Sequence, residues 1–369
     1  MNIQLLDLKA QYEELKDELT SAVLEVLESQ RYIGGKKVEE LEQKIADMSN
    51  SRFAVGASSG TDAILNTLMS LDIKEGDEVI TTPFTFFSTA GCIARLGAKP
   101  VFVDIKYDTF NIDPVKIKPA ISSRTKAIMP VHLFGQMAEM DAVMKIAEEN
   151  DLYVIEDAAQ AISATYKGNK AGSIGTAGCF SFFPSKNLGG IGDGGMVVTD
   201  DEKLYERLKI MRNHGSSPKY FHKYIGGNFR LDPIQAAALL VKLPYLDKWS
   251  EKRREHLDYY NQMFSGYPEI LVPTINDYCV SVVNQYVIRV KRRDELKEYL
   301  RKNGVGTEVY YPKPLHLQEC FKYLGYQNED LPVSEQAAKE VLALPIYPEM
   351  TEEMLTYVAE HVVNFVKNN

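Results

Sequence analysis

From residue 53 onward, short apolar segments alternate with longer segments whose apolar residues recur at helical spacing. The short segments are continuous runs of β-branched and other apolar residues, without a regular apolar–polar alternation. Strands of this kind are typical of a parallel sheet that helices cover on both faces. The sequence therefore predicts an α/β fold with a mostly parallel sheet. The expected strands lie at 53–55, 77–82, 100–104, 126–133, 152–155, 178–183 and 196–199, and the expected helices at 63–71, 86–96 and 140–150.

The segments on either side of this region predict a two-domain chain. Helical patterns precede residue 53, and a long polar helix at 245–264 follows a shorter one at 234–243. Because 369 residues exceed what one core usually serves, we expect a large domain at 1–245, N-terminal helices included, and a smaller α+β domain at 246–369. In the smaller domain the expected elements are strands at 280–290 and 306–311, a helix at 294–302 and two closing helices.

Charge and cysteine content restrict the possible partners and compartment. The net charge of −9 argues against non-specific binding to nucleic acid, and no helix-turn-helix with a basic recognition face is evident. The four cysteines form no CxxC pair and suggest no disulfide framework, so we expect a reducing cytoplasm. The charged N-terminus resembles neither a signal nor a transit peptide, and no apolar run approaches the roughly 20 residues of a membrane helix.

A hydroxyl-rich turn, Ser58-Ser59-Gly60-Thr61, lies between the first expected strand and its helix. The unpaired N–H groups and partial positive charge of a helix N-terminus attract anions. Glycine allows an anion to approach the backbone, and the hydroxyls add donors. The alternative is an ordinary helix cap, because serine and threonine favour that position in any case.

Two acids, Glu156 and Asp157, end an apolar strand at the sheet edge where such folds place their ligands. A carboxylate there is partly desolvated and needs a cation or several donors. A protonated pyridine nitrogen would be such a cation. A structural ion pair with an arginine or lysine is the alternative interpretation.

Lys186 stands between an aromatic strand end, Phe182-Phe183, and the glycine-rich segment 189–195. Most lysines are solvated surface charges, but this segment has little side-chain bulk and leaves room for another molecule. A lysine amine whose pKa is lowered from about 10.4 by desolvation can attack a carbonyl group. The glycines also match GxGxxG, but they lead into the strand at 196–199 and open no helix, so the match does not predict dinucleotide binding.

Together these segments resemble the sugar-nucleotide aminotransferases of the DegT/StrS family, which have the type I fold of pyridoxal-phosphate (PLP) enzymes. The resemblance covers nearly the whole chain and is greatest to the subgroup that aminates C3 of a dTDP-linked 3-keto-6-deoxyhexose. Six segments carry it in the family's order: 31–35, SSGTDA at 58–63, TPFTF at 82–86, EDAAQA at 156–161, SFFPSKN at 181–187 and GNFRL at 227–231.

The resemblance implies a PLP site shared across a homodimer. It implies that Lys186 carries the cofactor as a Schiff base and that Asp157 keeps the ring nitrogen protonated. Phe86 would stack on the ring. Without the resemblance, the sequence around Phe86 favours an ordinary core aromatic. Asn228 would reach the phosphate of the partner's cofactor. The alternative interpretation of Asn228 is a turn residue that caps the next helix. The remaining implied cofactor ligands are Ser59, Gly60, Thr61 and Ser181 at the phosphate and Gln160 near the ring hydroxyl.

The substrates implied are glutamate, as amino donor, and the nucleotide-linked keto-sugar; no metal is implied. Some relatives carry histidine in place of the lysine and dehydrate sugars, so Lys186 favours transamination. For His316, an ordinary loop histidine with no contact to the sugar is an equally good interpretation. The residues that stand where the family places sugar-binding groups are Tyr32, Arg230, Tyr311 and His316.

Three other functions are compatible with the sequence. The first is amination of C4 of a 4-keto sugar nucleotide, and the second is a non-catalytic regulator that binds PLP or a sugar nucleotide. The third is an enzyme that acts on ordinary amino acids, whose α-carboxylate such enzymes usually bind with an arginine. Arg289 and Arg301 are candidates for that arginine.

Overall fold

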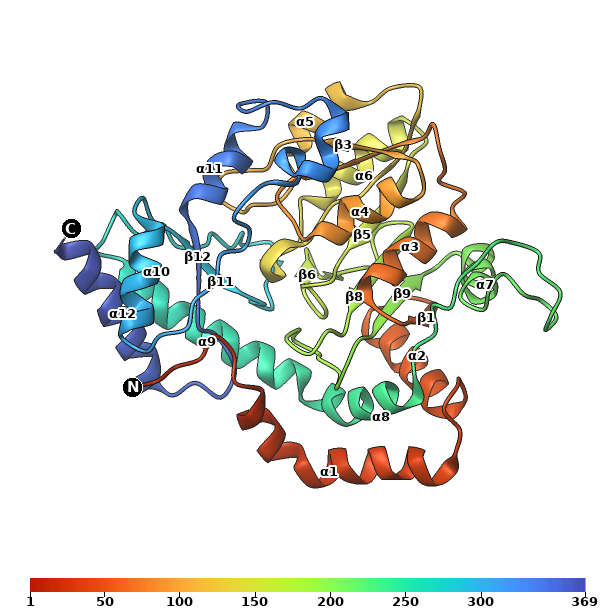
Figure 1. The fold of residues 1–369 in the computed structure, drawn as a ribbon, viewed down its shortest axis with the longest axis horizontal. Helices are drawn as coiled ribbons and strands as arrows, with labels where there is room; N and C mark the ends of the chain where they lie inside the picture. Colours follow the sequence, from red (N-terminus) through yellow and green to blue (C-terminus); the bar gives the residue numbers. More distant parts are fainter. Residues whose placement is uncertain (369) are drawn as a thin grey trace.

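A seven-stranded sheet forms the centre of the structure, a computed structural model that describes residues 1–368 (Figure 1). The strand order is β1-β9-β8-β5-β4-β2-β3. Strand β9 is antiparallel to both of its neighbours, and the other pairs are parallel. The prediction of a mostly parallel sheet is therefore confirmed. The strands are β1 (Phe53–Ala57), β2 (Glu78–Thr81), β3 (Lys99–Phe102), β4 (Thr125–Ile128), β5 (Tyr153–Asp157), β8 (Ala177–Ser181) and β9 (Gly195–Thr199).

Helices cover both faces of this sheet, which explains why its strands are continuously apolar. In β5, Val154 packs into one core with α2, α6 and α8, while the next residue, Ile155, packs into a second core with α3, α4 and α7. Successive strand residues point to opposite faces, and here both faces are buried. The helices of this part are α1 (Leu8–Ser29), α2 (Lys36–Met48), α3 (Gly60–Ser70), α4 (Phe87–Arg95), α5 (Pro114–Ala120), α6 (Met140–Glu149), α7 (Glu202–Met211) and α8 (Pro233–Lys242).

The C-terminal part has its own core around a two-stranded antiparallel sheet. Ile3, near the N-terminus, also packs into this core and bridges to Val305. The domain boundary at 245/246 stays a prediction. The elements are α9 (Leu246–Phe264), β11 (Tyr286–Arg289), α10 (Arg293–Lys302), α11 (Pro332–Glu340), β12 (Val341–Leu344) and α12 (Glu352–Lys367).

Two expected strands of the C-terminal part differ from the structure. The strand at 280–290 is broken, because the backbone N–H groups of Val282 and Asn284 donate to Gly135 and Phe134 of the large part. The expected strand at 306–311 does not form; Glu308 makes only an isolated bridge to Ala343 of β12. The short elements are β6 (Thr165–Tyr166), β7 (Asn169–Lys170), β10 (Cys279–Val280), and the 3₁₀ turns η1 (Leu133–Gly135), η2 (Leu243–Tyr245), η3 (Leu315–Leu317) and η4 (Glu319–Leu324).

None of the helices in residues 1–368 is long and apolar enough to cross a membrane. In the same residues, histidine, cysteine and acidic side chains form no group of three or more suited to a metal ion.

Candidate active site

The predicted anion-binding turn and the strand before Lys186 meet at the start of α3. Ser59 is the N-cap of α3, and its hydroxyl accepts a hydrogen bond from the backbone N–H of Asp62 at 3.0 Å. Gly60 lies so close to Ser181 that a Cβ on it would be 2.6 Å from the serine Cβ. The capping interpretation therefore holds for Ser59. The first-turn N–H groups of α3 and the Ser181 side chain beside Gly60 lie together at a helix N-terminus, an arrangement that suits a phosphate.

Asp157 ends β5 and is only 5% exposed. Its Oδ2 accepts a hydrogen bond from the Thr89 hydroxyl at 2.7 Å, and Oδ1 accepts one from the backbone N–H of Ala159 at 3.3 Å. Burial raises the pKa of Asp157, against the hydrogen bonds and the positive charge of Lys186. Within residues 1–368 no arginine or lysine forms an ion pair with Asp157, so the structural ion-pair interpretation finds no support.

The neighbouring acid, Glu156, has a structural role. Its Oε2 accepts from Nε2 of His132 at 2.8 Å. Because the Ala138 N–H donates to Nδ1 of His132, the ring hydrogen lies on Nε2. Three backbone N–H groups also donate to this carboxylate, so it ties the loop after β7 to the end of β4. Those N–H groups belong to Gly172, Ile174 and Gly175.

The Lys186 amine is partly buried and makes no hydrogen bond or ion pair with another group of residues 1–368. Burial lowers the pKa of Lys186 to about 8, although the negative charge of Asp157 acts in the opposite direction. At that pKa a substantial fraction of the amine is neutral near pH 8, which is the form that attacks a carbonyl carbon.

Gln160 connects the β5 segment to the C-terminal part of the chain. Its Oε1 accepts from the Phe134 N–H at 2.7 Å, and its Nε2 donates to the Tyr311 hydroxyl at 3.3 Å. Burial raises the pKa of Tyr311, so this hydroxyl stays neutral. A predicted sugar-binding residue thus contacts a predicted cofactor residue.

Phe86, the N-cap of α4, is 57% exposed. The alternative interpretation of Phe86 as an ordinary core aromatic therefore does not describe it.

Asn228, Arg230 and Tyr32 are predicted site residues that lie outside the β5 and Lys186 segments. Asn228 is exposed and forms an isolated bridge with Asn213, just after α7, and Arg230 is partly buried. The carbonyl of Phe229, between Asn228 and Arg230, accepts a hydrogen bond from the N–H of Ser58 at 3.1 Å, which sets this segment against the turn before α3. Tyr32 is partly exposed, and its hydroxyl accepts from the side chain of Gln30.

His316 is placed differently from the other predicted sugar-binding residues. Its side chain is fully buried, with Nε2 3.2 Å from the Glu335 carboxylate. Burial lowers the pKa of His316. This environment agrees with the plain interpretation of a packed loop histidine, and a contact with the sugar stays a prediction.

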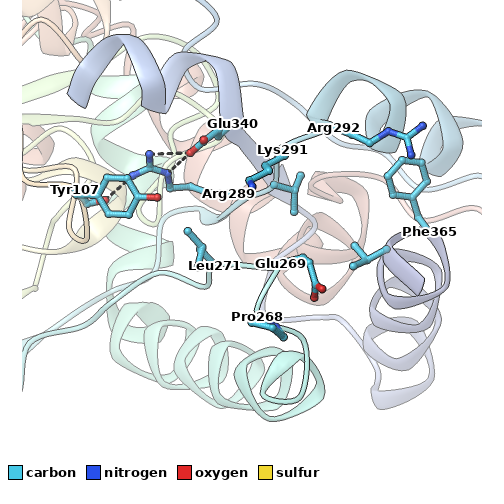
Figure 2. Close-up of a pocket in the computed structure, with 11 residues that line it drawn as sticks. Tyr107, Pro268, Glu269, Leu271, Arg289, Lys291, Arg292, Glu340 and Phe365 are labelled. Atoms are coloured by element: carbon cyan, nitrogen blue, oxygen red, sulfur yellow. Dashed lines mark hydrogen bonds and ion pairs between the residues drawn. The ribbon is translucent and has the colours of Figure 1, made fainter. Parts of the chain in front are cut away.

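A cavity of about 390 Å³ lies between the C-terminal part and Tyr107, and none of the predicted PLP- or sugar-binding residues lines it (Figure 2). Arg289, at its wall, pairs with Glu340 at 2.8 Å and donates to the Tyr107 carbonyl at 2.7 Å. Arg301 is paired with Glu298 at 2.7 Å on the exposed face of α10. Both arginines considered for an amino-acid carboxylate are therefore engaged elsewhere.

Comparison with known proteins identifies the family. The sequence model of the DegT/DnrJ/EryC1/StrS aminotransferase family matches residues 13–363. The chain belongs to this family. DegT-family aminotransferases are PLP-dependent, and the fold matches theirs. The solved structure of Streptomyces venezuelae DesV in complex with a ketimine intermediate superposes with a TM-score of 0.97, at 39% identity over 99% of each chain.

Three relatives of the chain carry names that differ in function and in sugar nucleotide. A "pleiotropic regulatory protein" of Geobacillus stearothermophilus is 50% identical over 100% of both chains. The dTDP-3-amino-3,6-dideoxy-alpha-D-galactopyranose transaminase of Aneurinibacillus thermoaerophilus is 42% identical over 98% of both. The UDP-N-acetyl-3-dehydro-alpha-D-glucosamine 3-aminotransferase of Acidithiobacillus ferrooxidans is 41% identical over 97% of this chain and 96% of its own. The chain is accordingly an aminotransferase of sugar nucleotides.

Proposed function

We propose that this aminotransferase moves an amino group from glutamate to C3 of a dTDP-linked 3-keto-6-deoxyhexose. The observation that carries the chemistry is the unpaired Lys186 amine, with its pKa lowered to about 8, near the buried carboxylate of Asp157. Support for C3 comes from the two curated aminotransferases above, whose names both specify position 3. The names differ in the nucleotide, and dTDP rests on the sequence resemblance and on the Aneurinibacillus relative.

The residues present fit PLP at each of its polar groups. The N-terminus of α3 at Gly60, with Ser181 beside it, would receive the phosphate, and Asp157 would face the ring nitrogen. Gln160 would lie near the ring hydroxyl, and the exposed face of Phe86 would cover the ring. When bound, PLP supplies an aldehyde that links to amines and a ring that accepts electrons.

Lys186 has two tasks in the proposed reaction. Its neutral amine would hold the cofactor as a Schiff base, and once freed by the amino donor it would move a proton between the donor's α-carbon and the cofactor. For the keto-sugar the same amine would move a proton in the opposite direction. Positioned proton transfer of this kind contributes about 10²–10⁴ in rate. Asp157 would stabilise a positively charged ring nitrogen, and Tyr311, beside Gln160, would orient the sugar.

The substrate is best tested in the reverse direction, with 2-oxoglutarate as amino acceptor and purified amino-sugar nucleotides as donors. A matched set would compare 3-amino and 4-amino 6-deoxyhexoses on dTDP, and a 3-amino sugar on UDP. We expect the highest kcat/KM for the dTDP-linked 3-amino sugar. Preference for the 4-amino sugar would establish the C4 alternative, and preference for UDP would correct the nucleotide. Binding without any turnover would favour a regulator.

We also propose a cytoplasmic homodimer with shared active sites. Residues 1–368 hold four free cysteines, three of them buried, as suits a reducing compartment. The exposed apolar side chains of the loop before Asn228 suit burial by a second copy. They are Tyr220, Phe221, Tyr224 and Ile225, with exposures of 78%, 69%, 40% and 92%.

If the active sites are shared between subunits, two inactive variants should regain activity when they form a mixed dimer. Lys186→Ala removes the amine, and Asn228→Asp places a negative charge against the phosphate. If Asn228 serves the partner's site, a heterodimer of the two variants has one fully wild-type site. Random assortment makes half the dimers mixed, so co-expression should give about one quarter of wild-type activity. No recovery in isolated heterodimers would show that Asn228 acts within its own subunit.

The lowered pKa of Lys186 predicts how cofactor attachment depends on pH. Only the neutral amine reacts, so the rate at which apoenzyme forms its imine with PLP should rise with pH and level off above about 8. A lysine with the ordinary pKa of about 10.4 would give a rate still rising at pH 10. Stopped-flow absorbance of PLP mixed with apoenzyme measures this profile. A midpoint near 10 would contradict the proposed environment of the amine.

A further inference from the structure

Thr89 has an unusual hydrogen bond for a helix threonine. In α3, the buried Thr67 hydroxyl donates to the carbonyl of Ala63, four residues earlier in its own helix, at 2.8 Å. This local bond is the common arrangement for threonine in a helix. Thr89, equally buried in the first turns of α4, instead directs its hydroxyl to Oδ2 of Asp157 at 2.7 Å, 68 residues away in the sequence.

A second hydroxyl lies behind Thr89. Thr85 Oγ1 is 3.1 Å from Thr89 Oγ1, and both residues are at most 2% exposed. An ionised carboxylate only accepts hydrogen bonds, so Thr89 must donate to Asp157. The Thr89 oxygen is then free to accept from Thr85. The direction of the chain is therefore fixed as Thr85 to Thr89 to Asp157, and each bond polarises the next.

The same turn carries the residue proposed to cover the ring. Phe86 lies between the two threonines in sequence and is the N-cap of α4, with its carbonyl accepting from the Thr89 N–H at 3.3 Å. One helical turn thus sets both the aromatic face and the donor to the carboxylate. The other hydrogen bond to the carboxylate comes from the Ala159 N–H, at the longer distance of 3.3 Å.

We propose that Thr89, oriented by Thr85, is a positioning residue that holds Asp157 ionised and aimed at the cofactor's ring nitrogen. Without its hydroxyl, Oδ2 would be buried and unpaired, and the carboxyl group would favour its protonated, neutral form. A neutral carboxyl group stabilises a cationic ring nitrogen less well. The inference rests on the proposed PLP site, and it concerns neither the sugar nor the amino donor.

The test compares the affinity of apoenzyme for two cofactors, PLP and an analogue with carbon in place of the ring nitrogen. Both carry the same aldehyde and phosphate, so general damage to the site weakens both equally, and only the ring-nitrogen interaction changes their ratio. We expect wild-type protein to prefer PLP, and Thr89→Val to reduce this preference about tenfold, as for a lost hydrogen bond to a charged group.

The controls separate the hydroxyl from the fold and from the proposed function. Thr89→Ser should keep the wild-type ratio, and so should Thr67→Val, which removes a buried hydroxyl that does not contact Asp157. If Thr89→Val does not fold, Thr85→Val should show a smaller change in the same direction. An unchanged ratio in folded Thr89→Val would overturn the inference while leaving the proposed function intact. Wild-type apoenzyme that binds neither cofactor would overturn the proposed function itself.

Discussion

Lys186→Ala is expected to abolish the visible absorbance of a covalent cofactor link and to lower kcat by at least about 10²–10⁴, the usual contribution of a positioned proton-transfer group. The loss should be large because one amine has both tasks. Within residues 1–368 the Lys186 amine makes no hydrogen bond or ion pair, and Asp157 is the charged group that acts on its pKa. Spectra of the purified variant and single-turnover kinetics with glutamate measure the two losses separately.

Lys186→Arg is the matched control for charge and length. Arginine keeps a cation near Asp157 but stays protonated, so it can neither form the link nor move a proton. Both variants should therefore lose the band, while Lys186→Arg retains more of the electrostatic environment. A small amine added to Lys186→Ala should restore part of the proton transfer. A wild-type absorbance band in either variant would show that another residue carries the cofactor.

Much of the architecture could be predicted because its causes are local. Buried parallel strands read as apolar runs, and Pro233 after Asp232 marks the start of α8. The same signal at Asp113 and Pro114 begins α5, a helix that was not among those expected. The strand expected at 280–290 is interrupted because its backbone pairs with residues 134–135. Such a contact, about 150 residues distant in the sequence, leaves no periodic signal.

The site shows the same division between local and distant causes. Lys186 and the turn at Ser59 and Gly60 have recognisable local settings, and the family resemblance joined them to Asp157. The pairing of Gln160 with Tyr311 spans 151 residues, and that of Thr89 with Asp157 spans 68. A threonine in a helix can bond to its own backbone or to a distant group, so only the fold distinguishes Thr89 from Thr67. The different roles of adjacent Glu156 and Asp157 likewise depend on which face of the strand each side chain takes.

Asp157→Asn should lower kcat about 10²–10³-fold, the usual cost of removing one preorganised electrostatic group from a buried site. Asparagine preserves the shape of the side chain and can still accept from Thr89, but it lacks the negative charge that keeps the ring nitrogen protonated. The KM for the sugar nucleotide should change little, because Asp157 is assigned to the ring nitrogen. Steady-state kinetics of the holoenzyme, with cofactor content measured, separate the two parameters.

A cofactor with a permanent charge tests the cause of that loss. In Asp157→Ala the missing carboxylate leaves room for a methyl group, so PLP methylated on its ring nitrogen can bind with a positive charge that needs no proton. If Asp157 acts by maintaining this charge, the methylated cofactor should raise the kcat of Asp157→Ala above its value with PLP. In wild-type protein the same cofactor should lower kcat, because the methyl group meets the carboxylate. Equal activity of Asp157→Ala with both cofactors would mean that Asp157 acts by some means other than charge at the ring nitrogen.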